Sequence, residues 1–324
     1  MNKEQRFSGR DVEAPSFEAR RVDKVGEKAS SEGERQDDER QSAKEVSVLR
    51  KKIEGLEPEV AGASDLVKID QFQERYLPEY LNSPRPSITS RFFSWAVRMK
   101  EKLSGREVVG RENIPEQGPY LVVSNHFGGE TGPLLSLFNK DNLHIAAGEE
   151  TNFKRSGFRS WLLKRLGMLP IKESAAKLDA GQRQELLQRV PGAVRQAAYS
   201  EIFRNSENGV VNNLPFMRAA IAAMSRGDAV AVFPEGVFTY DEQKALKQAY
   251  GGFDFLAKKY KELTGKDLPI LPVGISGKKI VIQPLTSYEK NQTEMENTDW
   301  IMAQLAKGLP EDERGYYHDL AEKI

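Results

Sequence analysis

A histidine stands directly after a short apolar run, with a carboxylate close behind it. The run 120–124 is rich in valine and has the length and composition of a buried strand, and Asn125 and His126 follow it. Glu130 and Thr131 come shortly after the histidine. At a strand exit, a histidine can take the proton of an attacking hydroxyl if another group orients its ring. A single histidine is weak evidence, because many such residues have structural or surface roles.

A second group of polar residues, Pro234-Glu235-Gly236, follows the apolar run 229–233. In α/β sheets, ligands bind beyond the carboxyl ends of the strands. If both apolar runs are strands, both groups of polar residues stand where a substrate would bind. A Pro-Glu-Gly turn alone is even weaker evidence of an active site than the histidine. Only the two groups together indicate one.

The elements that must position these residues are strands alternating with helices. Apolar runs predict strands at 106–109, 120–124, 143–147, 167–171, 229–233, 269–275 and 279–283. Helical spacing predicts helices at 131–138, 158–166, 215–224, 299–307 and 245–260, the last with an interruption at Gly251-Gly252. This alternation predicts an α/β fold with a central mixed sheet flanked by helices.

The composition excludes several kinds of chemistry. The 324 residues include 48 basic and 48 acidic side chains, so the overall charge does not indicate nucleic-acid binding. Cysteine is absent, which excludes disulfides and thiol catalysis, and three scattered histidines do not predict a metal site. We expect no signal peptide, and every apolar run is shorter than the roughly 18 residues of a spanning helix. Any contact with a membrane is therefore expected to be peripheral.

The N-terminal part of the chain differs from the rest. Residues 1–64 are predicted to be a disordered charged tail, because they have too little apolar surface to offset the entropy of ordering. A helical region, 65–105, follows, with an amphipathic helix from Ser87 or Thr89 to Leu103. Its apolar residues are Phe92, Trp95, Ala96, Met99 and Leu103, and its basic residues Arg91, Arg98, Lys100 and Lys102 outnumber Glu101. Such a helix either lies in a membrane surface or packs on the core of its own domain.

Four blocks of sequence, in order, resemble the glycerolipid acyltransferases, whose familiar members are lysophosphatidic acid acyltransferase and glycerol-3-phosphate acyltransferase. The blocks are 123–126, 167–171, 232–236 and 270–275, and the third is the most specific. The resemblance implies a single acyltransferase domain, which we place at 106–324. The polar, mostly helical stretch 174–213 is an insertion in the simpler family pattern, and it is either a lid, a partner surface or a plain surface excursion.

The resemblance also implies a reaction and a set of site residues. His126 would deprotonate a hydroxyl of a glycerolipid such as 1-acylglycerol-3-phosphate, and the oxygen would attack the thioester of acyl-CoA or acyl carrier protein. No metal, cofactor or covalent enzyme intermediate is implied. Glu235 and Gly236 would help bind the acceptor, Asn125 would also bind substrate, and Pro272 would shape the acyl-donor side.

The first block departs from the family pattern. The family has an aspartate five residues after the histidine, where this chain has Thr131. A threonine brings no charge to stabilise an imidazolium, and loss of the orienting carboxylate costs about 10⁴ in rate in a serine protease triad. Glu130 stands one position early and is longer than aspartate by one methylene. Either Glu130 replaces the aspartate, or the site is impaired or differently built.

The residues at the positions that bind phosphate in the family also differ from the family pattern. Val237-Phe238-Thr239 stands where the family has Thr-Arg-Ser, and Glu173 stands where the second block ends in arginine. Phenylalanine cannot hold a phosphate as the planar fork of arginine does, and a glutamate would repel it. Lys172, Lys154 or Arg155 would then serve as point charges, or the acceptor has no phosphate there. A further alternative is a non-catalytic member of the family that binds lipid or acyl thioester.

The expected partners follow from this resemblance. They are an acyl thioester donor, a lysophospholipid or related lipid acceptor and a membrane surface, with no nucleic acid. We therefore expect a cytoplasmic protein of phospholipid biosynthesis that is peripherally associated with the membrane.

Overall fold

The computed structural model describes most of the chain from residue 88 onward. The described residues are Val48, 51–52, 88–128, 130–138, 143–154, 157–207, 213–236, Phe238, 244–291 and 293–324. Contacts divide the chain into two units, Met1–Val48 and Leu49–Ile324, and everything below concerns the second unit. The predicted disordered tail, 1–64, lies almost entirely outside the described residues.

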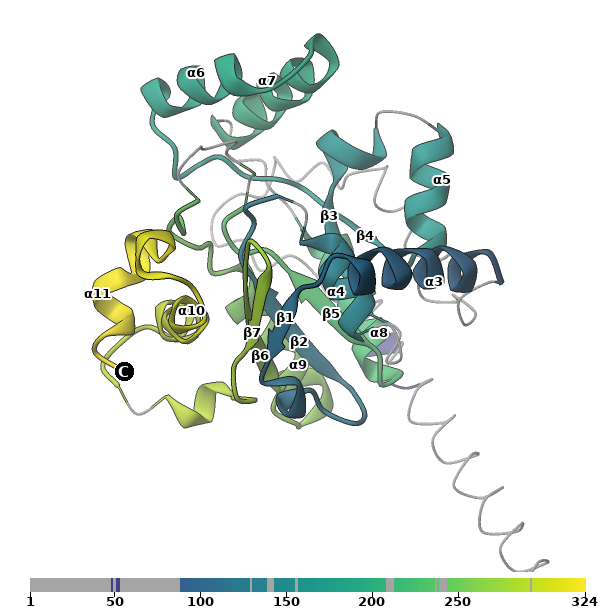
Figure 1. Ribbon diagram of the computed structural model, residues 1–324, viewed down its shortest axis with the longest axis vertical. Coiled ribbons are helices and arrows are strands. Elements are labelled where there is room, and N and C mark those ends of the chain that lie inside the picture. The colour runs from purple at the N-terminus through teal and green to yellow at the C-terminus, as the bar shows by residue number, and fades with distance from the viewer. Residues whose placement is uncertain are drawn as a thin grey trace, which may run out of the picture. The chain divides into compact units, whose positions relative to one another are not determined.

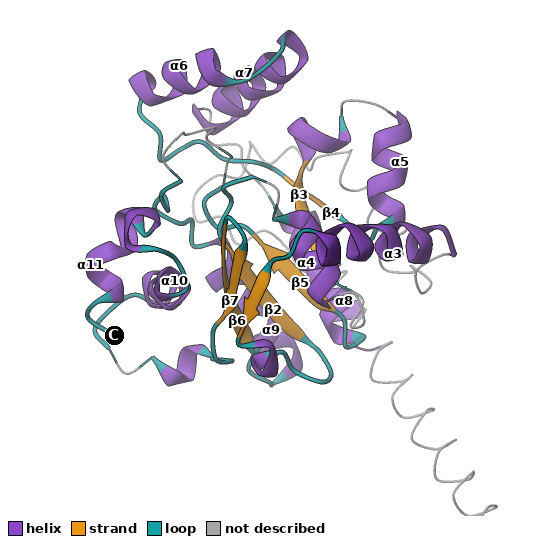
Figure 2. Ribbon diagram, viewed as in Figure 1, coloured by secondary structure: helices purple, strands orange, loops and turns teal. Residues whose placement is uncertain are grey.

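A seven-stranded mixed sheet forms the centre of the described chain (Figures 1 and 2). Its order is β1-β7-β6-β2-β5-β3-β4. The five strands from β6 to β4 are parallel, whereas β7 runs antiparallel to β6, and β1 is parallel to β7. The strands are β1 (Glu107–Val109), β2 (Tyr120–Ser124), β3 (His144–Gly148), β4 (Leu169–Ile171), β5 (Ala229–Val232), β6 (Ile270–Ser276) and β7 (Lys279–Ile282).

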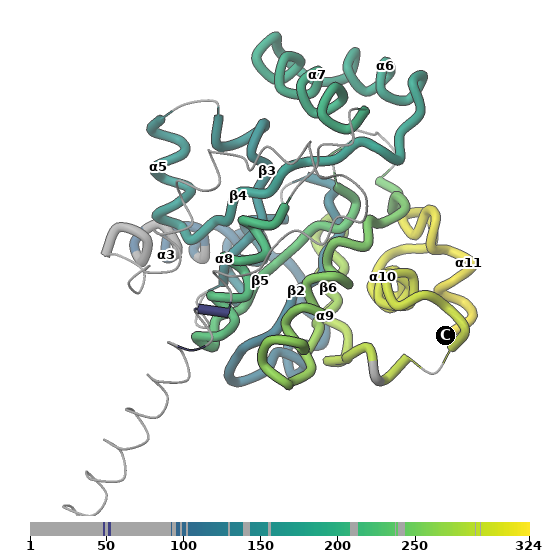
Figure 3. The backbone as a smooth tube through the Cα atoms, turned by 180° about the vertical axis from the view of Figure 1, so that it is seen from behind, coloured from purple at the N-terminus to yellow at the C-terminus, as the bar shows by residue number. Residues whose placement is uncertain are grey.

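The central strands are apolar on both faces because helices cover both sides of the sheet. Along β2, Leu121 and Val123 point to one face, and Tyr120 and Val122 point to the other. The first face is covered by α8 (Leu214–Ser225), α9 (Gly252–Thr264), α10 (Asn297–Lys307) and α11 (His318–Ala321). The second face is covered by α4 (Thr131–Phe138), with Val97 of α3 (Ile88–Leu103) and Leu163 of α5 (Gly157–Arg165) packed against the same cluster. Figure 3 shows the arrangement from behind.

The insertion consists of two helices with a small core of their own. They are α6 (Ala180–Arg189) and α7 (Ala193–Glu207). Asp179 and Gln182 form a reciprocal capping box at the start of α6, which satisfies amides that a helix leaves unpaired at its first turn. The core residues are Ala175, Leu186, Val190, Tyr199, Ile202 and Phe203.

The helix predicted at 245–260 is wrong in its first part. Residues 244–250 are not helical, and α9 begins at Gly252. The backbone amides of this segment donate to distant partners instead of to a helical turn, so long-range bonds replace the local ones. These bonds run from Leu246 to Glu313, from Lys247 to Glu235, from Ala249 to Tyr317 and from Tyr250 to Pro234.

The predicted fold class is confirmed: the domain is α/β, with a mixed sheet between layers of helices, and the amphipathic helix precedes it as α3. No described helix is both long enough and apolar enough to cross a bilayer.

Candidate active site

The polar groups identified from the sequence meet at one edge of the sheet. The strands β2, β5, β3 and β4 are parallel neighbours, so their carboxyl ends lie together. His126 follows β2 and Glu235 follows β5, while Lys172 and Glu173 follow β4. The two groups of polar residues are therefore brought together, as the sequence predicted.

The Asn125 side chain continues the hydrogen bonding between β2 and β6 beyond the end of β2. Its Nδ2 donates to the carbonyl of Ile275 at 2.9 Å, and its Oδ1 accepts from the Ile275 amide at 2.8 Å. The side chain is fully buried. Asn125 thereby ties the end of β2 to β6 and fixes the point at which His126 leaves the sheet, whereas its predicted contact with substrate remains a prediction.

The Glu235 carboxylate is a clamp between two backbone segments. Oε1 accepts the amide of His126 at 2.7 Å, and Oε2 accepts the amide of Lys247 at 3.0 Å. Burial raises the pKa of Glu235, while the two amide hydrogen bonds oppose that rise. Because both oxygens are engaged by backbone, the position of the histidine loop depends on this side chain. Its predicted contact with the acceptor remains a prediction.

The His126 ring is held by two aromatic rings and faces one carboxylate. It stacks on Phe233, with 4.6 Å between ring centroids, and meets Phe238 edge-on at 5.4 Å. Its Nδ1 lies 3.5 Å from Oε2 of Glu130, which is almost completely buried. That separation is within ion-pair range but long for a hydrogen bond, and Nδ1 makes no hydrogen bond to any described residue. The carboxylate nevertheless points at the ring nitrogen that an orienting group would bind.

Thr131 is the first residue of α4 and lines the same cavity as His126. Within the described part of the chain, the ring nitrogen of the histidine is approached by Glu130 and not by the threonine hydroxyl. The geometry thus favours the glutamate over the threonine as the group that faces the imidazole.

A cavity of about 1020 Å³ opens beside the histidine. Gly236 lines it with a φ of +84°, and a Cβ at this position would lie 2.5 Å from the ring of Tyr250 and 2.9 Å from the carbonyl oxygen of Ser174. A glycine is therefore required for the turn after Glu235 and for its close approach to the insertion.

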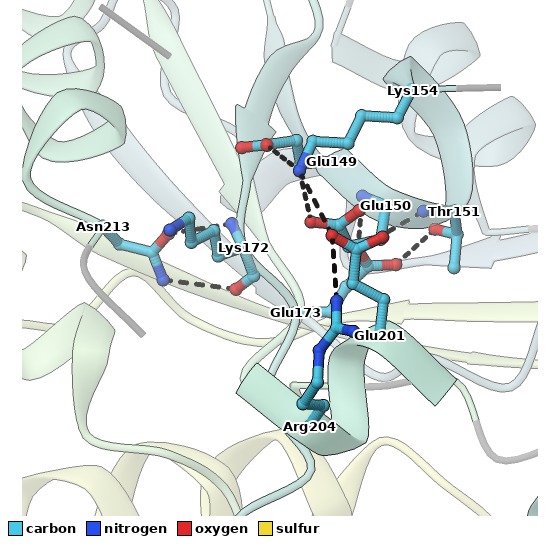
Figure 4. A network of polar contacts seen from close by, with 9 residues as sticks. All are labelled: Glu149, Glu150, Thr151, Lys154, Lys172, Glu173, Glu201, Arg204 and Asn213. Carbon is cyan, nitrogen blue, oxygen red and sulfur yellow. Dashed lines mark hydrogen bonds and ion pairs between the residues drawn. The ribbon is translucent and has the colours of Figure 1, made fainter. Parts of the chain in front are cut away.

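Glu173 does not stand free in the cavity as an isolated negative charge. Its carboxylate accepts the Glu150 amide at 3.0 Å and the Thr151 amide at 3.5 Å, and it also accepts the Thr151 hydroxyl. These donors belong to a π-helical turn, Glu149–Phe153, that follows β3 (Figure 4). Burial raises the pKa of Glu173 to about 7, against the opposing effect of these hydrogen bonds. The residue thus caps the turn that forms one wall of the cavity.

The basic residues proposed to replace the phosphate-binding arginines have different surroundings. Lys154 pairs with Glu149 at 2.9 Å and with Glu150 at 2.6 Å; burial lowers its pKa, but the two carboxylates together outweigh that effect and raise it. Lys172 lines the cavity, and its backbone is held by Asn213 (Figure 4). Arg155 lies outside the described residues.

The insertion forms part of the cavity wall, which the sequence alone left undecided. The Tyr199 hydroxyl of α7 donates to the carbonyl of Phe238 at 2.6 Å, and Phe238 is the residue that meets His126 edge-on. The only signal in the sequence was the length of the insertion between two blocks of the site. The cavity-lining residues from this segment are Ser174, Ala176, Arg195, Tyr199, Ser206 and Asn213.

Pro272 lies away from this wall. It is buried in the middle of β6, opposite Val123, and its carbonyl accepts the amide of Gln283 at 3.0 Å. It is not among the described residues that line the cavity, and its predicted role on the donor side remains a prediction. The described residues contain no group of three or more His, Cys, Asp or Glu side chains that could hold a metal ion.

Comparisons with known proteins place the chain in a family. A family model described as Acyltransferase matches residues 105–276. A solved structure, the crystal structure of the 1-acyl-sn-glycerophosphate (LPA) acyltransferase PlsC from Thermotoga maritima, is similar with a TM-score of 0.43 and 16% sequence identity, over 73% of this chain and 86% of that one. No curated protein matches the chain. Because the family model spans more than half of its residues, the chain belongs to the acyltransferase family.

Proposed function

We propose that this acyltransferase moves a fatty acyl group from acyl-CoA or acyl carrier protein to a hydroxyl of a glycerolipid such as 1-acylglycerol-3-phosphate, with His126 as the general base. One observation carries the proposal. The His126 ring, fixed between Phe233 and Phe238, opens onto a large cavity while its Nδ1 faces the buried carboxylate of Glu130.

The proposed reaction needs only groups of the chain and the two substrates. The imidazole takes the proton of the acceptor hydroxyl while that oxygen attacks the thioester carbonyl. A carbon–oxygen bond forms and the carbon–sulfur bond breaks, and the imidazolium returns the proton to the departing thiolate. The Glu130 carboxylate stabilises the transient positive charge on the ring, and the 3.5 Å separation shortens to a hydrogen bond when that charge forms. The proposal includes no metal, no cofactor and no covalent intermediate.

The cavity suits a long apolar substrate with a polar end. Its volume is at the upper end of the range for small-molecule sites, and most of its lining surface is apolar. Glu235 supports this site through the backbone of His126, and the absence of a side chain at Gly236 allows Tyr250 to approach the turn closely. The apolar side chains on the wall include Leu163, Met168, Ile171, Leu214, Phe216, Met217, Phe253, Phe255 and Leu256.

The lipid acceptor is proposed to enter from a membrane surface at the cytoplasmic face. Along α3, a stripe of apolar side chains is exposed, with Phe92 at 61%, Trp95 at 55%, Met99 at 41% and Leu103 at 82%. These side chains do not pack on the core of the domain, which favours the membrane alternative for this basic helix.

The helix α5 offers a second set of exposed aromatic residues close to the cavity. Phe158 and Trp161 are exposed and stack on each other at 5.9 Å, and Arg165 lies over the Trp161 ring at 5.1 Å. Arg159 and Leu163 of the same helix line the cavity. Aromatic side chains beside basic ones are typical of helices that lie on an anionic bilayer, so α5 would join the bilayer to the cavity.

The reaction can be tested with the purified chain and labelled acyl-CoA or acyl carrier protein. We expect transfer of label to 1-acylglycerol-3-phosphate or to another member of a panel of hydroxyl-bearing glycerolipids. The His126→Ala variant should lose transfer, because it removes the imidazole that is proposed to take the proton of the acceptor hydroxyl. His318→Ala, an exposed histidine of α11, is the matched control and should keep it. Absence of transfer by the wild type to every acceptor, or undiminished transfer by His126→Ala, would refute the proposal.

The membrane contact can be tested by flotation with vesicles that contain anionic lipid. The double variants Phe92→Ala/Trp95→Ala and Phe158→Ala/Trp161→Ala should each reduce the bound fraction, by about tenfold or more in partition constant, because each removes two large apolar side chains. Val194→Ala, an exposed position of the insertion, should have no effect. Unchanged binding of both double variants would rule out this face as the docking surface.

A further inference from the structure

The cavity wall has an excess of positive charge. Among the described residues that line it, Glu173 is the only acidic one, and its carboxylate already accepts hydrogen bonds from the turn after β3. The basic lining residues are Arg159, Lys172, Arg195 and Lys259. Fixed charges of one sign on the walls of a cleft concentrate ligands of the opposite sign. The wall therefore suits a substrate that carries an anionic group.

Arg195 comes from the insertion and lines the same cavity as His126. It stands on α7 four residues before Tyr199, which places the two side chains on one face of the helix, about 6 Å apart along its axis. Tyr199 is bonded to the carbonyl of Phe238, whose ring contacts His126. The helix that carries Arg195 is therefore tied, through the Tyr199 hydroxyl, to a residue that contacts His126.

Among the residues that the structure describes, none pairs with the guanidinium of Arg195. Although the side chain is partly buried, no described residue forms an ion pair or a side-chain hydrogen bond with it. The comparable arginine Arg204, farther along α7, is exposed and approaches Glu201 at 4.0 Å. A partly buried arginine that faces a cavity without a carboxylate partner can bind an anionic ligand with its planar fork.

We infer that Arg195 binds a phosphoryl group of a substrate, so that the insertion is a specificity element of the site. The inference rests on the proposed function and names the substrate class that it requires. Neither Phe238 nor Glu173 can supply this contact at the exits of β5 and β4, because one is apolar and the other is acidic. The phosphoryl group belongs either to the acceptor, as in 1-acylglycerol-3-phosphate, or to the CoA part of the donor.

Kinetics with matched substrates distinguish the two sources. The variants are Arg195→Gln, Arg195→Lys and the control Arg204→Gln. The acceptors are 1-acylglycerol-3-phosphate and 1-acylglycerol, and the donors are acyl-CoA and the phosphate-free acyl-N-acetylcysteamine. We expect Arg195→Gln to raise the KM of one phosphate-bearing substrate by about ten- to a hundredfold, with kcat nearly unchanged, because a hydrogen-bonded charge pair is lost. Arg195→Lys should recover part of the loss, and Arg204→Gln should behave as wild type.

The pattern of KM values assigns the source. If the acceptor phosphate is bound, the increase occurs with 1-acylglycerol-3-phosphate and not with 1-acylglycerol. If the donor is bound, the increase occurs with acyl-CoA and not with acyl-N-acetylcysteamine. An equal increase for phosphate-bearing and phosphate-free substrates, or no increase at all, would overturn the inference while leaving the proposed reaction intact.

A binding measurement separates this inference from the proposed function. Calorimetric titration with CoA, and with glycerol 3-phosphate against glycerol, needs no turnover. Weaker binding of one phosphate ligand to Arg195→Gln supports the inference even if the wild type transfers no acyl group, whereas equal binding of both phosphate ligands to variant and wild type contradicts it. Thermal unfolding of each variant checks that the fold is unchanged.

Discussion

Two glutamates, each at the exit of a parallel strand on the same edge of the sheet, use their carboxylates in the same way. Glu235, after β5, accepts the amide of His126, which follows the adjacent strand β2. Glu173, after β4, accepts the amide of Glu150, which follows the adjacent strand β3. Each carboxylate also binds a second backbone amide, and so each fixes a segment that leaves the neighbouring strand.

The two clamps differ in what they hold. Glu235 is buried and fixes the loop of the proposed base, whereas Glu173 is partly buried and fixes a wall of the cavity. A carboxylate at a strand exit, which from sequence is expected to meet substrate, can instead act on the backbone next to it. We therefore expect changes at Glu235 to affect catalysis most strongly, and changes at Glu173 to affect mainly stability and its dependence on pH.

Of the changes that test this comparison, Glu235→Gln should have the largest effect. The amide group of glutamine offers one acceptor where two amides must be satisfied, so one buried N–H loses its partner at a cost of about 1–3 kcal/mol in unfolding free energy. Because the affected amides include that of His126, kcat should fall by about a hundredfold. Urea unfolding and acyl-transfer kinetics measure the two effects. Wild-type kcat in this variant would show that the clamp does not position the base.

Glu173→Gln should change the pH dependence of stability. The pKa of Glu173 is raised to about 7 in the folded chain, so its contribution to stability is fully present below pH 4.5 and is lost as pH rises through 7. The wild type should thus lose up to about 3 kcal/mol of unfolding free energy between pH 4.5 and 7.5 relative to the glutamine variant. Urea unfolding at both pH values tests this prediction, and parallel pH profiles of the two proteins would contradict it.

Of the three changes that test the comparison, Tyr199→Phe should have the smallest effect. It removes the hydroxyl that donates to Phe238 but keeps the ring in the core of the insertion, so about 1 kcal/mol is lost. We expect a decrease in kcat/KM of roughly threefold to tenfold, because Phe238 would hold the His126 ring less firmly. Ser200→Ala, at the next position of α7, is the control. A larger loss of activity in Tyr199→Phe than in Glu235→Gln would contradict the expectation that the Glu235 clamp matters most for catalysis.

Local patterns predicted the fold because the central strands are apolar on both faces and end at polar residues. The strands β2, β5 and β6 and the positions of His126 and Gly236 follow from such runs. Segments whose conformation depends on distant partners could not be predicted in this way. The stretch 244–250 has helical spacing, yet its amides bond to residues far along the chain.

The candidate site was only partly predictable for the same reason. The bond between Asn125 and Ile275 spans 150 residues, and the clamp from Glu235 to His126 spans 109, so neither could be inferred from spacing. The contribution of the insertion also depends on tertiary packing, because the Tyr199 hydroxyl bonds to Phe238, which is 39 residues away along the chain. The choice between Glu130 and Thr131 needed the direction of a side chain, which the sequence leaves open.

The central claim is that the Glu130 carboxylate, and not the Thr131 hydroxyl, supports His126 as the base. It is tested most directly by comparing kcat/KM for acyl transfer in Glu130→Gln and Thr131→Ala. We predict that Glu130→Gln lowers kcat/KM by about 10²–10⁴, as the loss of an orienting carboxylate does in a catalytic triad, and that Thr131→Ala lowers it by less than about tenfold. Wild-type kcat/KM in Glu130→Gln, or a larger loss in Thr131→Ala, would contradict the claim.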